Sequence, residues 1–146
     1  MSIRRLKSSG DTIVEVLLAI AVLGAVLSAA YVSANRSQKN IRQAQERGEA
    51  LQFVQAQLEL IKDMATNDQQ SGALFSEIQP FCIIDSSYTI VIPPAPGCSF
   101  GTDGRYGITV QRTVSGTGHL FTVTAVWDNV IGSGQDNITS SYRIQQ

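Results

Sequence analysis

Between Ile13 and Val32 the chain is apolar except for one charged residue, Glu15. A helix of these 20 residues would span about 30 Å, the thickness of the hydrocarbon core of a bilayer. The pattern therefore predicts a membrane-spanning helix. Residues 1–10 contribute Arg4, Arg5 and Lys7 and no acid, which predicts a cytoplasmic N-terminus with the rest of the chain outside.

After Val32 the sequence becomes polar, but apolar or small residues continue to recur at intervals of three and four, as on one face of a helix. Other residues around this segment carry charges of both signs, which favours a solvated or partner-facing surface. Because no proline interrupts the pattern, we predict one continuous helix from about Ile13 to Met64. The stripe comprises Ile41, Ala44, Gly48, Leu51, Val54, Leu58, Ile61 and Ala65, widened by Ala50, Phe53, Leu60 and Met64.

Residues 66–72 are predicted to end the helix, and beyond them the apolar period changes to alternation. Strands are expected at residues 82–92, 105–114, 119–127 and 137–144, separated by loops rich in Pro, Gly, Asn and Asp. A small sheet cannot bury its apolar face alone, so the helix stripe is its natural partner. The predicted fold class is α+β, with a long N-terminal helix packed on a small antiparallel sheet.

Charge weighs against a nucleic-acid partner. The net charge is −1, from 11 basic and 12 acidic residues. Without the three bases of residues 1–10 the remainder has 8 basic and 12 acidic residues, a net of −4. Phosphate binding relies on clustered Lys and Arg, whereas the basic residues of the remainder are scattered or have acids near them in sequence.

The two cysteines, Cys82 and Cys98, enclose a loop of 15 residues and have no histidine nearby. A zinc site would need more ligands. Outside the cytoplasm a disulfide is expected, which would stabilise the fold by about 3 kcal/mol in the chain-entropy model. Two reduced, buried cysteines are the alternative.

Other polar residues give no catalytic or cofactor site. His119 is the only histidine, and we expect it to face solvent at the start of a strand. Asp103, Asp128 and Asp136 lie in loops but lack the ligand spacing of a calcium loop, so turn formation is favoured. We predict no metal, no cofactor and no enzymatic activity.

The order of elements and a short motif resemble the type IV pilin and type II secretion pseudopilin family. Gly10, Thr12, Ile13, Val14 and Glu15 match the family's processing motif, while Asp11 stands where most members have Phe. Residues 49–62 and the final strands look like minor pilins of the pilus-modification type.

The resemblance implies a specific processing step and a division of the chain. A prepilin peptidase would cut between Gly10 and Asp11 and methylate the new amine of Asp11. Residues 1–10 would then be a removed leader, 11–32 the transmembrane and filament-core half of the helix, 33–65 its amphipathic half, and 66–146 a globular β domain. The implied partners are other pilin subunits, the peptidase, a membrane platform protein, an assembly ATPase and the lipid bilayer.

Two roles are open for Glu15. It could form a capping box with Thr12, satisfying amides at the helix start. Alternatively, in a filament it pairs with the α-amine exposed on a neighbouring subunit after cleavage, which would be largely cationic at neutral pH. The carboxylate of Asp11 lies beside that amine in sequence and would weaken the second interaction.

The predicted function is a structural subunit of a type IV pilus-like filament, anchored in the cytoplasmic membrane before assembly at the cell surface. The alternatives are a pseudopilin of a type II secretion or DNA-uptake machine, an adhesive tip module, and a monomeric anchored domain. A cleaved secretory signal is disfavoured, because Glu15 interrupts the apolar run and the run exceeds the usual length.

Overall fold

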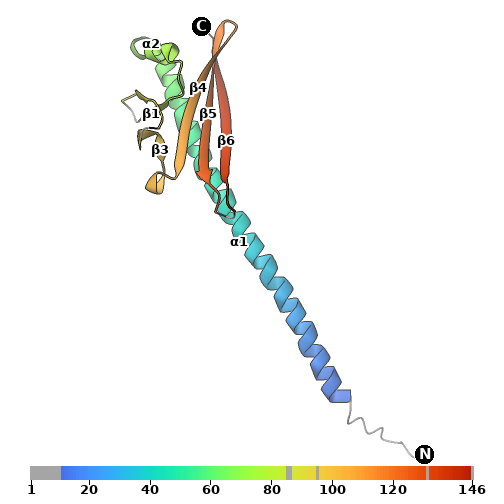
Figure 1. Ribbon diagram of the computed structural model, residues 1–146. Coiled ribbons are helices and arrows are strands. Elements are labelled where there is room, and N and C mark those ends of the chain that lie inside the picture. The colour runs from blue at the N-terminus through green and yellow to red at the C-terminus, as the bar shows by residue number, and fades with distance from the viewer. Residues whose placement is uncertain (1–10, 85–86, 95, 131, 146) are drawn as a thin grey trace, which may run out of the picture. The chain divides into compact units, whose positions relative to one another are not determined.

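The computed structural model describes residues 11–84, 87–94, 96–130 and 132–145. The chain divides into two compact units, Met1–Ile41 and Arg42–Gln146. Its elements, labelled in Figure 1, are α1 (Asp11–Thr66), α2 (Asp68–Ser76), β1 (Cys82–Ile84), β2 (Thr89–Val91), η1 (Pro96–Cys98), β3 (Ser99–Phe100), η2 (Thr102–Gly104), β4 (Tyr106–Ser115), β5 (Gly118–Asp128) and β6 (Gln135–Gln145).

Helix α1 confirms the long helix predicted from residue 13 to residue 64, with two further residues at each end. The first unit contains the apolar part of this helix, and residues 13–41 are exposed throughout. The second unit contains the later part of α1 together with every other described element. The fold is α+β, as predicted.

The main sheet has four antiparallel strands in the order β3-β4-β5-β6. The three long strands run side by side in Figure 1, with Val110 opposite Val123 and Val123 opposite Ser140. They confirm the strands expected at 105–114, 119–127 and 137–144. Strands β4 and β5 are joined by a tight turn in which Gly116 has a φ of 60°, a conformation that favours glycine.

Three sequence predictions are wrong in detail. Residues 82–92 form a two-stranded antiparallel hairpin, β1 and β2, rather than one strand. The sequence Asp85-Ser86-Ser87 between them consists of turn-forming residue types. Residues 66–72 do end α1, but α2 begins at Asp68, so most of this stretch is helical. The short strand β3 also lies in a stretch predicted to be a loop.

The core of the second unit lies between the later part of α1 and the sheet. One face of β5 supplies Phe121, Val123 and Ala125, all fully buried, as the alternation predicted. The buried helix face is narrower than the predicted stripe, because Leu51 and Ile41 are exposed. From α1 the buried residues are Glu46, Ala50, Val54, Gln57, Ile61 and Met64.

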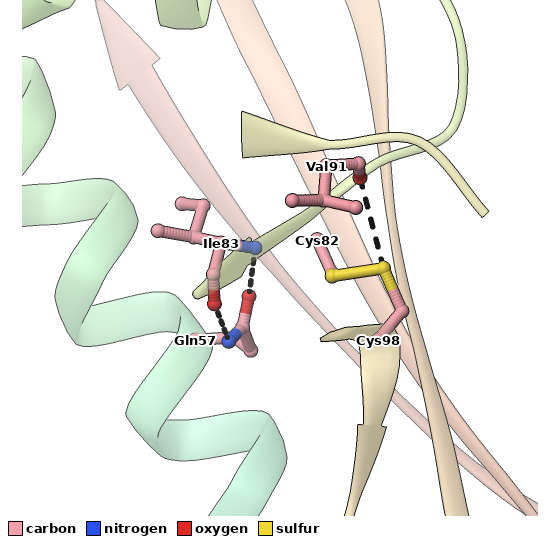
Figure 2. The surroundings of a disulfide bond; sticks show 5 residues. All are labelled: Gln57, Cys82, Ile83, Val91 and Cys98. Carbon is pink, nitrogen blue, oxygen red and sulfur yellow. Dashed lines mark hydrogen bonds between the residues drawn. A yellow bond between two sulfur atoms is a disulfide. The ribbon is translucent and has the colours of Figure 1, made fainter. Parts of the chain in front are cut away.

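Gln57 is a polar residue within this buried face. Its side-chain nitrogen donates to the carbonyl oxygen of Ile83 at 2.7 Å, and its oxygen accepts from the backbone N–H of Ile83 at 3.0 Å. Figure 2 shows both bonds beside the disulfide. One amide thus satisfies both backbone groups of a buried residue in β1, as a neighbouring strand would. The contact fixes the short hairpin to α1.

We predict that Gln57→Ala lowers the free energy of unfolding by about 2–4 kcal/mol, because the buried N–H and C=O of Ile83 lose their partner. Urea denaturation of the full chain in detergent micelles, followed by the fluorescence of the buried Trp127, measures the change. Gln55→Ala is the matched control, since Gln55 is exposed on the same helix, and should cost less than about 0.5 kcal/mol. Equal losses in the two variants would contradict the assigned role.

Candidate functional site

The first candidate site is the apolar surface of α1, which we define as residues 13–32. Its large hydrophobic side chains are between 49% and 73% exposed. Among the described residues, α1 is the one helix with the length and composition to cross a membrane. So large an unburied apolar surface is unfavourable in water. It therefore requires lipid or other protein around it.

Small residues interrupt this surface at Ala19, Ala21, Gly24, Ala25, Ser28 and Ala29. A Cβ atom added to Gly24 would meet no atom within 4 Å, so the fold of the chain itself does not require glycine there. In a membrane, small residues allow helix backbones to approach closely. This part of the surface is therefore chemically suited to contact with another helix.

Glu15 is the only charged residue on the apolar surface, and it is exposed. No described side chain pairs with it. Gly10, on one side of the predicted cleavage bond, lies outside the described residues. Asp11 is the first residue of α1, and the helix already includes Thr12. The predicted capping box of Thr12 and Glu15 involves a side chain that lies outside the described part of the structure.

The disulfide predicted between Cys82 and Cys98 is present. The two Cα atoms are 5.6 Å apart, and both residues are buried. The bond joins β1 to the end of η1 (Figure 2). The Sγ atom of Cys98 also lies 3.6 Å from the carbonyl oxygen of Val91, but a disulfide sulfur has no hydrogen to donate. The bond closes a loop that begins in β1 and ends at Cys98.

A second set of polar contacts joins α1 to residues 105 and 106 within the second unit. Arg105 pairs with Oε1 of Glu46, and the hydroxyl of Tyr106 donates to Oε2 of Glu49 at 2.8 Å. Glu46 is only 7% exposed, so the solvated or partner-facing surface expected for the charged residues of this segment does not include it. Its position four residues before Ala50, in phase with the buried helix face, is a signal that the sequence analysis missed.

His119 does not face solvent as expected. It is half-buried, and its ring stacks on that of Phe75 with centroids 4.8 Å apart. Nδ1 of His119 lies 3.1 Å from the guanidinium of Arg112. Because arginine can only donate, Nδ1 must accept this hydrogen bond. The histidine thus helps to pack α2 on the sheet.

Two of the three aspartates predicted to lie in loops belong to strands, Asp128 as the last residue of β5 and Asp136 as the second residue of β6. The side chain of Asn129 donates to Asp136 at 3.0 Å, and that of Gln135 donates to Asp128 at 3.3 Å. Asp103 has a φ of 61° within η2. Over the described residues, no three His, Cys, Asp or Glu side chains come together as a metal site would need. Asp128 and Asp136 thus help to join the ends of β5 and β6, and the prediction that they form turns is wrong.

Comparisons of the chain with protein-family models, with curated proteins and with solved structures find no match. The architecture of a long apolar N-terminal helix, an antiparallel sheet and a disulfide is pilin-like. A single long apolar helix near the N-terminus also suggests a membrane anchor or a signal. Any more specific function must be argued from the residues themselves.

Tyr106 combines burial with an acidic neighbour. Burial of its side chain, together with the hydrogen bond to Glu49, raises the pKa of Tyr106 to about 12. In an unfolded chain a tyrosine has a pKa near 10. Above pH 10 the unfolded state therefore binds fewer protons than the folded state. It follows that stability falls as the pH rises toward 12.

We predict that the free energy of unfolding decreases by up to about 3 kcal/mol between pH 10 and pH 12 because of Tyr106. Tyr106→Phe removes this contribution, so the variant should lose correspondingly less stability over the same interval. Urea denaturation of both proteins across this pH range measures the difference between the two curves. Parallel curves would show that Tyr106 does not titrate with a raised pKa.

Proposed function

We propose that this protein is a structural, non-enzymatic subunit of a type IV pilus-like filament, anchored in the cytoplasmic membrane before assembly. The observation that carries the proposal is the contrast along α1. Its large apolar side chains between residues 13 and 32 are at least 49% exposed, whereas residues such as Val54 and Ile61 are fully buried under the sheet. One helix thus has a part that needs external apolar surroundings and a part that holds a folded domain.

The two environments that suit this apolar surface are a bilayer and a bundle of equivalent helices. Lipid surrounds it in the precursor, and the same segments of other subunits surround it in the filament. The small residues from Ala19 to Ala29 allow such helices to pack closely. The disulfide between Cys82 and Cys98 supports a domain that resides outside the cytoplasm, because disulfides persist in oxidising compartments.

Processing begins with cleavage between Gly10 and Asp11 by a prepilin peptidase, followed by methylation of the new amine of Asp11. Both steps rest on the resemblance of residues 10–15 to the family's motif. The released amine is cationic, and Glu15 has no described partner within its own chain. We infer that Glu15 pairs with the amine of a neighbouring subunit. In apolar surroundings such a pair is favourable only when both charges are present and well aligned.

We predict that Glu15→Gln reduces incorporation into filaments by on the order of a hundredfold, because it leaves the neighbour's amine buried without its partner. Immunoblots of sheared surface material and of membranes measure incorporation and precursor level separately. The membrane level should stay unchanged.

Glu59→Gln is the matched control, since Glu59 is also exposed on α1 but lies outside the apolar surface. It should assemble like the wild type. Normal filament incorporation of Glu15→Gln would overturn the proposed charge pair.

A further inference from the structure

Two cations follow the apolar surface of α1 within the first unit. Arg36 and Lys39 are the only charged residues between Val16 and Ile41, so this stretch contains no acid. We call these two residues the cationic collar. Both side chains are exposed, and no described residue pairs with either of them. The collar therefore presents uncompensated positive charge.

The position of the collar relates it to a bilayer surface. This argument rests on the proposed membrane insertion of residues 13–32. Arg36 is four residues beyond Val32 and Lys39 seven, or about 6 Å and 10 Å along a helix axis. The headgroup region extends roughly 5–8 Å beyond the hydrocarbon core on each side. Arg36 thus lies at the depth of the lipid phosphates, and Lys39 lies at their outer edge.

Helix geometry brings the side chains of the collar closer to the lipid. Every Cα–Cβ bond in an α-helix tilts toward the N-terminus. For a helix that crosses the membrane at its N-terminal end, this direction points back to the bilayer. The long side chains of Arg36 and Lys39 can therefore extend to the phosphate layer while their alkyl stems cover apolar surface.

Acids of a second copy of the chain are a poorer match for the collar. In the second unit Glu59 and Asp103 are exposed and make no hydrogen bond to described residues, but several other acids already accept hydrogen bonds within their own domain. Arg105 binds Glu46, Tyr106 binds Glu49, Tyr88 binds Asp63, and the backbone amides of Ile78 and Gln79 bind Glu77. A second copy of the chain that paired with these carboxylates would have to replace contacts that stabilise the fold. Anionic phospholipid offers negative charge without that cost.

We propose that the cationic collar binds the headgroups of anionic phospholipids at the outer surface of the membrane. The interaction holds the precursor at a defined depth, and it must be released when the subunit leaves the bilayer. Each Lys or Arg near an anionic surface contributes on the order of a fivefold preference, which salt screens. The lipid composition of the membrane thereby influences how readily subunits enter the filament.

The test reconstitutes the full chain from detergent into a mixture of two vesicle populations that can be separated by density. One contains phosphatidylcholine alone, and the other contains equal amounts of phosphatidylcholine and phosphatidylglycerol. At low salt the wild type should favour the anionic vesicles. The variant with Arg36→Gln and Lys39→Gln should lose at least about tenfold of that preference, and high salt should reduce the difference between the two proteins.

A charge-matched control carries Arg47→Gln and Lys62→Gln, which removes two cations outside the collar. It should keep the preference of the wild type, as should Arg36→Lys. An unchanged preference in the collar variant would overturn the proposal, even if all proteins float with the vesicles. Chemical crosslinking of the floated proteins gives a second readout. If the collar variant instead loses crosslinked dimers in both vesicle types, the proposal is also overturned, because that result assigns the collar to contact with a second copy.

If no protein floats with either vesicle type, the membrane insertion on which the proposed function depends is contradicted. The collar proposal then loses its basis as well. Resistance of the floated proteins to alkaline extraction provides an independent readout of insertion. The two proposals can therefore fail separately.

Discussion

The exposed apolar surface of residues 13–32 is the constraint on which the rest of the molecule depends. Exposure of so much apolar surface to water is unfavourable, so residues 13–32 must be surrounded by lipid or by other helices. The surface contains one carboxylate, on Glu15, and several small residues that permit close packing. These features explain why we interpret one segment as both an anchor and an assembly surface, rather than as a plain hydrophobic tether.

The second unit gives the same helix a separate structural role. Val54 and Ile61 are fully buried against the sheet, while Gln57 replaces a neighbouring strand for the backbone of Ile83. The disulfide closes the loop that begins in that strand. Packing on the long helix orders the small sheet and its short hairpin, and the same packing buries one face of the helix. The domain can therefore remain folded while the surroundings of residues 13–32 change.

The sequence predicted the elements whose periodicity extends over many residues. The long helix, the three long strands and the disulfide are confirmed, because each repeats one pattern or pairs two residues of one type. The β1–β2 hairpin was predicted as one strand, and α2 was not predicted. Such short elements depend on contacts from elsewhere in the chain. The role of Gln57 is of this kind: its partner Ile83 is 26 residues away. Glu46 was expected outside the core because it is charged, although its position has the spacing of the buried helix face.

The central claim is that the apolar helix is first held in lipid and then in a filament, with processing between the two states. Mass spectrometry of the N-terminal peptide, from filaments sheared off cells that produce the chain, tests this claim most directly. The account predicts a chain that starts at Asp11 and carries one added methyl group. An intact Met1, a start beyond Ala30, or absence of the polypeptide from the sheared material would contradict it.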